Sequence, residues 1–246
     1  MSTIADNISQ VSARIAAAAR QAQREPSQVG LLAVSKTKPA TAIREAFAAG
    51  VRDFGENYLQ EALSKQEELV DLPLIWHFIG PIQSNKTRAI AEHFAWVHSV
   101  DRLKIAQRLS EQRPSTLAPL NVCIQVNVSG EASKSGCAPG DVLALATAIA
   151  ALPNLHLRGL MAIPEPTDDP VAQDAAFARV RTLQHDLQLP LDTLSMGMSH
   201  DLEAAIAQGA TWVRIGTALF GARDYGQHTP PADTGVAPSP FTKDPS

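Results

Sequence analysis

The amino-acid sequence predicts a single (β/α)8 barrel, the TIM-barrel fold of class α/β, with an extra helix at its amino terminus. Short apolar runs typical of buried strands alternate with helical patterns eight times, and short connections join them. The length of 246 residues agrees with the roughly 250 residues of this architecture. An open doubly wound sheet is the alternative. It would normally carry a glycine-rich phosphate turn, and neither G-x-G-x-x-G nor G-x-x-x-x-G-K-[ST] occurs in the chain.

The elements follow in order from the amino terminus. Ile4, Ile8, Val11 and Ile15 recur at helical spacing, which predicts a first amphipathic helix that docks on the domain. The first strand is predicted at 29–35, and a helix at 39–50 opens with Pro39 and ends at Gly50. The later strands are predicted at 52–56, 74–80, 95–100, 121–129, 157–163, 191–197 and 211–216. The remaining helices are predicted at 56–70, 83–93, 101–112, 140–152, 170–188 and 201–208.

Composition bounds the class of protein. With 45% hydrophobic and 19% charged residues, the chain is of the globular type. A formal charge of -4 provides no basic surface for a phosphate backbone, so nucleic acid is not an expected partner. Cys123 and Cys137 form neither a close metal-ligand pair nor a disulfide framework, which favours the cytoplasm. No apolar run is long enough for a membrane span, and Asp6 disfavours the alternative of a transit peptide.

The composition changes near the carboxyl terminus. Residues 226–246 are polar and rich in proline and show no apolar periodicity. Such a segment cannot bury enough surface to offset its ordering entropy. We therefore expect one domain at 1–225 and a disordered tail at 226–246. A closed barrel has no sheet edge to cover, which favours a monomer.

Lys36 is the first candidate for chemistry, because it directly follows the apolar run of the first predicted strand. The working groups of such barrels lie where strands end. Partial burial there disfavours the ammonium and makes a neutral amine available to react with an aldehyde. The alternative is structural: Lys36 leaves the strand for solvent, or pairs with Glu56.

The loops after the seventh and eighth strands have the features of a phosphate site. Gly197 and Gly216 allow close backbone approach, and Ser199 and Thr217 offer hydroxyls. Barrel proteins often bind phosphate after these two strands. The alternative is that the hydroxyls only cap their own helices. Together with the lysine, the loops favour a phosphorylated aldehyde as ligand.

Five segments carry a resemblance to a known family. They are AVSKTKP (33–39), FGENY (54–58), WHFIGPIQSNK (76–86), 195–201 and 214–221. Through them the sequence, from about residue 5 to 225, resembles the pyridoxal phosphate homeostasis proteins. The resemblance implies an alanine-racemase-like barrel that holds pyridoxal 5'-phosphate (PLP) as a Schiff base on Lys36.

The resemblance also implies the other cofactor contacts. By this resemblance, Ser199, Gly216 and Thr217 bind the phosphate. Met196 and Gly197 shape the loop, and Arg214 faces the pyridine nitrogen. Asn57 ends the second strand beside the lysine, where it can contact the ligand ring or cap the following helix.

The implied function is intracellular PLP homeostasis, in which the protein buffers or delivers the cofactor and apo-enzymes that use it are candidate partners. A guanidinium disfavours protonation of the pyridine nitrogen, so Arg214 weakens the ring as an electron sink. Racemisation there also needs a second base opposite Lys36. In related racemases that base is a tyrosine of an added β-domain, whereas Tyr58 and Tyr225 are interpreted as packing or rim residues. A single-domain racemase, a Schiff-base aldolase and a non-catalytic scaffold are the alternatives.

Three other polar features receive structural interpretations. His77 lies inside a predicted strand and is interpreted as a buried, hydrogen-bonded residue near the site. Lys134 is interpreted as an exposed loop lysine, with a second PLP contact as the alternative. No H-E-x-x-H or C-x-x-C motif occurs, so no metal site is predicted.

Overall fold

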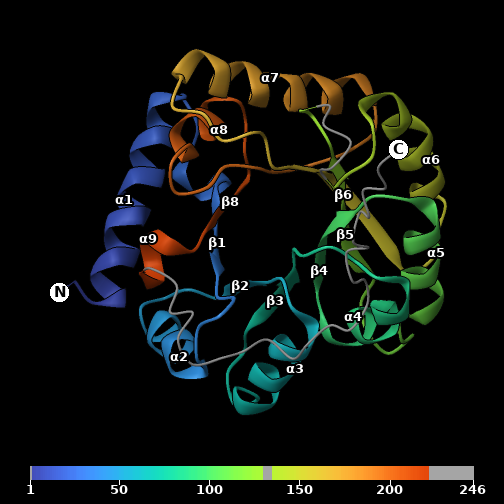
Figure 1. Ribbon diagram of the computed structural model, residues 1–246, viewed down its shortest axis with the longest axis horizontal. Helices are drawn as coiled ribbons and strands as arrows, with labels where there is room; N and C mark the ends of the chain where they lie inside the picture. The colour runs from blue at the N-terminus through green and yellow to red at the C-terminus, as the bar shows by residue number, and fades with distance from the viewer. Residues whose placement is uncertain (1, 130–134, 222–246) are drawn as a thin grey trace, which may run out of the picture.

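The computed structural model describes residues 2–129 and 135–221. Eight parallel strands pair in sequence order, and the last pairs with the first, so the sheet closes into a barrel that is ringed by helices (Figure 1). The predicted (β/α)8 barrel is confirmed. Lys134, Tyr225 and the predicted tail at 226–246 lie outside the described residues.

The strands lie close to their predicted positions. They are β1 (Gly30–Val34), β2 (Asp53–Glu56), β3 (Ile75–Phe78), β4 (Trp96–Val100), β5 (Leu120–Val126), β6 (Leu155–Ala162), β7 (Thr193–Ser195) and β8 (Trp212–Ile215). β6 begins two residues earlier than predicted, because Leu155 and His156 continue the pairing with β5.

The helices also follow the prediction. The α-helices are α1 (Ile4–Gln21), α2 (Ala40–Ala48), α3 (Leu59–Glu68), α4 (Thr87–His93), α5 (Leu103–Gln112), α6 (Val142–Ala150), α7 (Pro170–Asp186), α8 (Leu202–Ala207) and α9 (Thr217–Phe220). Short 3-10 helices are η1 (Pro26–Gln28), η2 (Ser84–Lys86) and η3 (Pro139–Asp141). The predicted helix at 83–93 is thus divided into η2 and α4.

Helix α1 is the predicted extra helix. Thr3 and Asp6 form a capping box at its start, which satisfies two backbone N–H groups that the first turn leaves without partners. Its buried stripe includes Ile8, Val11 and Ile15, and the helix packs beside α8, α9 and α2 (Figure 1). α1 therefore fixes the two helices that follow the last two strands.

The apolar core has two parts. The larger part lies between the strands and the outer helices, where Phe78 and Phe94 meet edge to face with ring centroids 5.3 Å apart. The smaller part is a cluster of Trp96, Cys123 and Met161, on β4, β5 and β6. Burial raises the pKa of Cys123 to about 12, so this thiol stays protonated at neutral pH.

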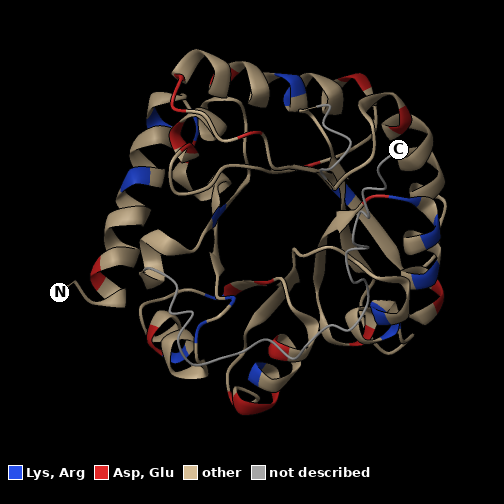
Figure 2. Ribbon diagram, viewed as in Figure 1, with Lys and Arg blue, Asp and Glu red and all other residues tan. Residues whose placement is uncertain are grey.

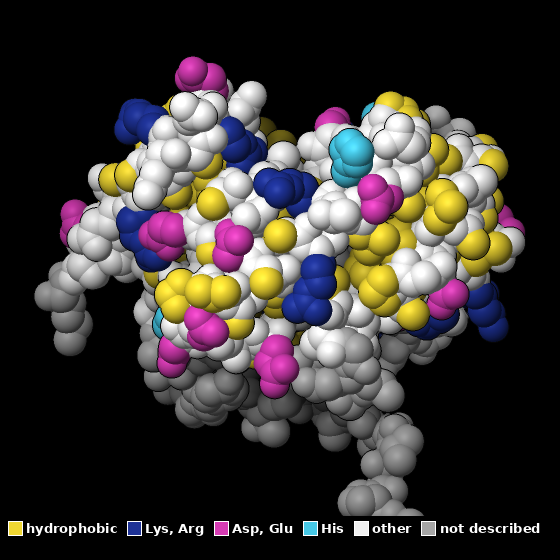
Figure 3. Space-filling view, turned by 90° about the horizontal axis from the view of Figure 1, so that it is seen from above, with side chains coloured by type: hydrophobic (Ala, Val, Ile, Leu, Met, Phe, Trp, Pro, Cys, Tyr) yellow, Lys and Arg dark blue, Asp and Glu magenta, His cyan; other side chains and the backbone are white. Residues whose placement is uncertain are grey.

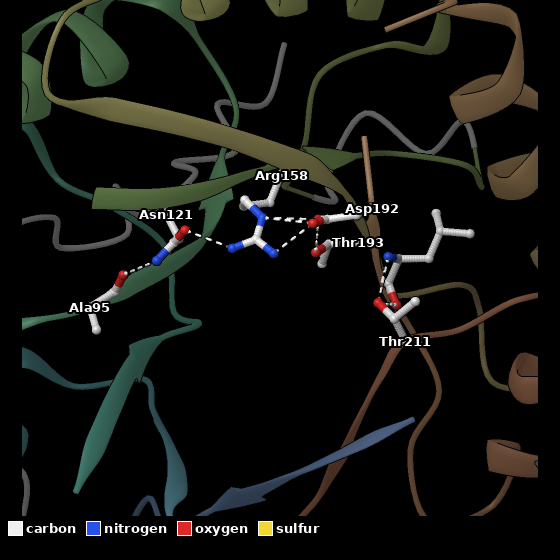
Figure 4. Close-up of polar contacts among 7 residues, drawn as sticks. Ala95, Asn121, Arg158, Asp192, Thr193 and Thr211 are labelled. Carbon is white, nitrogen blue, oxygen red and sulfur yellow. Dashed lines mark hydrogen bonds and ion pairs between the residues drawn. The ribbon is translucent and has the colours of Figure 1, made fainter. Parts of the chain in front are cut away.

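A polar network joins the amino ends of neighbouring strands (Figure 4). The Arg158 guanidinium donates to Asn121 Oδ1 at 2.9 Å and pairs with Asp192 at 2.6 Å. Asn121 Nδ2 donates in turn to the carbonyl of Ala95 at 3.2 Å. The guanidinium carbon also lies 4.8 Å from the ring centroid of Trp96. These contacts link β5, β6 and the residues before β4 and β7 below the aromatic interior.

Charged residues lie mainly on the outer helices and loops (Figure 2). On the face that Figure 3 displays, side chains of both signs are interspersed. Within 2–129 and 135–221, no helix is both long enough and apolar enough to span a bilayer.

Replacing Arg158 with alanine is expected to lower the free energy of unfolding by about 1–3 kcal/mol, because Asn121 and Asp192 lose charge-assisted hydrogen bonds. Chemical denaturation measures the change. Arg179→Ala, at an exposed position of α7, is the control and is expected to change stability by about 0.5 kcal/mol or less. Equal losses in the two variants would contradict the prediction.

Candidate functional site

Four adjacent strands gather the predicted site residues. β7 pairs with β8, β8 with β1, and β1 with β2, and all carboxyl ends of a parallel barrel open on one face. The predicted residues at or just beyond these ends are Lys36, Asn57, Met196, Gly197, Ser199, Arg214, Gly216 and Thr217. The structure therefore brings them to one arc of the barrel mouth.

Lys36 lies just beyond β1 and is half-buried. The preceding Ser35 hydroxyl donates to Glu56 Oε1 at 2.6 Å, on the side where α3 packs. Lys36 itself opens the turn that follows β1. Glu56 is bound by Lys65 at 2.8 Å, which disfavours the alternative that it serves as the partner of Lys36.

A buried ionic cluster anchors the chain on both sides of Lys36. Lys65 Nζ donates to the Ser35 carbonyl at 2.7 Å, to Glu56 at 2.8 Å and to Glu61 at 2.6 Å. The Thr37 amide also donates to Glu61, at 2.5 Å. Thr37 adopts φ 63°, a left-handed conformation that is strained for a β-branched residue. The cluster thus holds a strained turn next to the candidate nucleophile.

Burial governs the electrostatics of this cluster. Glu56 is fully buried, and desolvation raises its pKa, whereas the charge of Lys65 acts in the opposite direction. Its second oxygen, Oε2, has no hydrogen-bond partner among the described residues. Lys65 therefore supplies the countercharge that offsets the desolvation cost of the buried carboxylate.

Asn57 extends the line of β2 at the mouth. The N-cap of α3 is Tyr58, so Asn57 does not cap this helix, and the capping alternative is wrong. Its Oδ1 atom is buried and has no hydrogen-bond partner within the described chain. Gly80 packs against its backbone, where a Cβ would come within 2.2 Å of the Asn57 carbonyl oxygen. Asn57 is thus a buried acceptor without a donor among the described residues.

The loop after β7 turns at Gly197. Its φ is 93°, and a Cβ there would lie 2.5 Å from the Cβ of Ala205, so only glycine fits. The Met198 amide donates to Asp201 Oδ1 at 2.6 Å, which closes the turn. Met196 is fully buried in the apolar core, so its side chain supports the loop from below.

The two hydroxyl residues do not cap their helices. The N-cap of α8 is Asp201 and that of α9 is Gly216, which makes the capping alternative for Ser199 and Thr217 wrong. The Ser199 carbonyl accepts a hydrogen bond from Arg14 Nη2 at 3.1 Å. The Arg214 amide on β8 donates to the Gly197 carbonyl at 2.9 Å, which holds the turn after β7 against β8.

Arg214 is a buried cation with neutral partners. Its Nη1 donates to Ser195 Oγ at 2.9 Å and its Nη2 to the Ala162 carbonyl at 2.9 Å. Burial lowers its pKa to about 10, so the guanidinium remains charged at neutral pH. These hydrogen-bond partners are neutral, and the charge of Asp201 acts to raise the pKa of Arg214. A buried cation whose hydrogen bonds within the described residues go to neutral groups favours a ligand that accepts hydrogen bonds or carries negative charge.

Other predicted residues take secondary places. Tyr58 is 56% exposed, as predicted for a rim residue. His77 is fully buried and hydrogen-bonded to His98 and Asp53, as predicted.

Sequence reasoning missed Arg14 and Lys65, which support the site from helices. Arg14 on α1 also pairs with Glu203 of α8 at 2.8 Å. Glu61 and Lys65 lie four residues apart on the predicted helix. This i,i+4 spacing was the sequence signal that could have indicated the ion pair.

The barrel carries a lysine just after β1 and an arginine on β8, and it is of the alanine racemase N-terminal domain class. The chain matches the family "Alanine racemase, N-terminal domain" over residues 7–224. It is 79% identical over 226 residues to the "Pyridoxal phosphate homeostasis protein" of Pseudomonas aeruginosa, covering 92% of this chain and 98% of that protein. The protein of the same description from Escherichia coli K12 is 55% identical over 235 residues, with 92% and 99% covered. The chain belongs to the pyridoxal phosphate homeostasis protein family.

A solved structure agrees with this assignment. PipY of Synechococcus elongatus PCC7942, described as having PLP bound, is 43% identical and has a TM-score of 0.78. The match covers 89% of this chain and 100% of that chain.

Replacing Lys65 with methionine is expected to lower the free energy of unfolding by about 3–5 kcal/mol at pH 8, because Glu56 becomes an unpaired buried carboxylate. Loss of the lysine charge raises the pKa of Glu56 further. A carboxyl whose pKa is higher folded than unfolded stabilises the fold at low pH, and this contribution is lost as pH rises through the folded pKa. The deficit is therefore smaller at pH 5.

Urea unfolding of both proteins at pH 5 and pH 8 measures the deficit. Lys104→Met, at an exposed position of α5, is the control and is expected to show little loss at either pH. A deficit of the same size at both pH values would mean that Glu56 does not cause it.

Proposed function

We propose that this chain binds PLP as a Schiff base on Lys36 and acts in the homeostasis of that cofactor without turning over amino acids. The observation that carries the proposal is Arg214, a buried cation on β8 whose hydrogen bonds within the described residues go to neutral groups. Membership of the family and the PLP-bound PipY structure support it.

The donor and acceptor set at the mouth fits this cofactor. PLP supplies an aldehyde that reacts with an amine and a pyridine ring that withdraws electrons from the product. Lys36 would provide the amine, and the partnerless Oδ1 of Asn57 would accept a hydrogen bond at the ring. The Arg214 guanidinium would donate to the ring nitrogen, which accepts hydrogen bonds when it is unprotonated.

The loops after β7 and β8 would hold the phosphate. Ser199 and Thr217 would donate their hydroxyls, and the backbone at Gly216 would approach closely. Gly197 permits the turn that positions Ser199. Arg14 stabilises the same loop by its hydrogen bond to the Ser199 carbonyl.

Two features favour binding over turnover. Arg214 keeps its charge at neutral pH and so disfavours protonation of the ring nitrogen, which weakens the electron sink. Lys36 supplies one base, and the exposure of Tyr58 at the start of α3 makes it a poor candidate for a second base. A cofactor-binding site with one base among the described residues suits a carrier better than a racemase.

The wider proposal concerns the whole chain. Residues 1–225 would form one PLP-binding domain that works as a monomer in the cytoplasm, with 226–246 as a separate tail. Apo-enzymes that depend on PLP would be the recipients of the cofactor.

The first experiment compares the absorbance spectra of the wild-type protein and the Lys36→Ala variant after incubation with PLP. A visible band in the wild type, absent from the variant, is expected because only the wild type offers the amine. Borohydride reduction followed by peptide mass analysis should place the cofactor on Lys36. Lys104→Ala, on α5, is the matched control and should retain the band.

Further readouts separate the alternatives. Lys36-dependent racemisation of amino acids would favour the racemase, and trapping of sugar phosphates instead of PLP would favour the aldolase. No band in the wild-type protein, together with no stabilisation by any phosphate ligand, would overturn PLP binding itself.

Asn57→Ala is expected to weaken PLP binding about tenfold while leaving the stability of the ligand-free protein nearly unchanged, because the lost acceptor has no hydrogen-bond partner in 2–129 or 135–221. Fluorescence titration and thermal unfolding measure the two effects. Gln112→Ala removes another partnerless buried amide oxygen, on α5, and serves as the control. If both variants lost affinity equally, Asn57 would not be a ligand contact.

A further inference from the structure

A chain of hydrogen bonds runs from Arg214 through the barrel. Arg214 Nη1 lies 2.9 Å from Ser195 Oγ, and Ser195 Oγ lies 2.7 Å from His98 Nδ1. His98 Nε2 lies 3.0 Å from His77 Nδ1. His77 Nε2 lies 3.0 Å from Asp53 Oδ1. The links connect β8, β7, β4, β3 and β2, so they span the barrel from the mouth to the amino end of β2.

The two histidines are isolated from solvent. Both are fully buried, and the His77 ring stacks on Trp96 with centroids 5.5 Å apart and planes 6° apart. Trp212 meets the same ring edge to face at 5.2 Å. Burial lowers the pKa of both histidines, and the charge of Arg214 lowers that of His98 further, whereas Asp53 acts in the opposite direction on His77. Both rings are therefore neutral at pH 7, with one N–H each.

One arrangement of hydrogens satisfies all the links. A carboxylate only accepts, so His77 must carry its hydrogen on Nε2 and must accept at Nδ1. His98 then donates from Nε2 and accepts at Nδ1, which requires the Ser195 hydroxyl to donate to it. The Ser195 oxygen is left to accept from Arg214, whose guanidinium only donates. Every donor in the chain points from Arg214 toward Asp53.

The far end of the chain is open. The Asp53 side chain is 22% exposed and borders a cavity of about 300 Å³ between α1 and the segment 49–53. Arg214 at the other end is 5% exposed. The charge of Asp53, at the solvent-facing end, thus orients the hydrogen-bonded side chains that lead to the buried Arg214 at the mouth.

We propose that Asp53, His77, His98 and Ser195 form a positioning relay that fixes the Arg214 guanidinium where it meets the ring nitrogen of the cofactor. The role of the relay toward the cofactor rests on the proposed function, whereas the direction of its hydrogen bonds does not. Its role is to keep the Ser195 oxygen turned to Arg214, because a reversed hydroxyl would point its hydrogen at the cation. Asp53 sets this direction from the opposite end of the barrel.

The first test uses the ligand-free protein. Long-range 1H–15N NMR of the histidine rings, assigned with His77→Gln and His98→Gln, should find the hydrogen of each ring on Nε2. In Asp53→Leu, no acceptor fixes His77, so both rings should distribute the hydrogen between the two nitrogens. A ring that carries its hydrogen on Nδ1 in the wild-type protein, or unchanged tautomers in Asp53→Leu, would overturn the relay.

The second test uses the PLP-loaded protein. Asp53→Leu and Ser195→Ala are each expected to raise the Kd for PLP about five- to tenfold and to move the visible absorbance band. Asp192→Leu is the matched control, because Asp192 also lies at the amino end but pairs with Arg158 outside the relay. It should lose stability with unchanged tautomers, Kd and band.

The outcomes are separable. Tautomers that change in Asp53→Leu without any effect on Kd or band would overturn the positioning role. If Asp53→Leu fails to fold, Ser195→Ala alone decides this point, since it removes a single oxygen. A wild-type protein that binds no PLP would overturn the proposed function, while the NMR experiment would still decide the order of the relay.

Discussion

The pairing of β1 with β8 is the constraint on which the rest of the structure depends. It joins residues 30–33 to residues 212–215 and leaves the sheet without an edge. Closure places Lys36 and Gly216 beyond adjacent strand ends, although they are far apart in the sequence. It also encloses an interior that side chains must fill, and here indole and imidazole rings fill much of it. The pairing that closes the barrel therefore also brings the site residues together.

The buried polar groups form connected networks on both sides of the sheet. The ionic cluster of Glu56 and Lys65 lies outside the strands and holds the turn at Lys36, whereas the relay from Asp53 to Arg214 lies inside them. Each buried charge is joined to groups that restrict its orientation, which limits the cost of its desolvation. The mouth is thus pre-organised from both faces of the sheet.

Local patterns in the sequence were sufficient for the strands, for the first helix and for the residues that follow the strand ends, because periodicity and strand ordinal are local properties. They were not sufficient for the relay. The sequence patterns gave His98 no role and included Ser195 only within the segment 195–201, since contacts between β4 and β7 depend on barrel register. Glu56 was weighed as a partner of Lys36, but strand alternation turns it to Lys65 on α3. Tertiary geometry decided each of these cases.

Helix α1 gives the barrel an order of completion. Asn7 donates to the Leu219 carbonyl and Arg14 to the Ser199 carbonyl, across 212 and 185 residues of chain. During synthesis, α1 emerges well before the segments that hold its two docking partners. The supporting hydrogen bonds of Arg14 and Asn7 can consequently form only after residues 199 and 219 have been synthesised. Contacts between residues so far apart in the sequence are associated with slow folding.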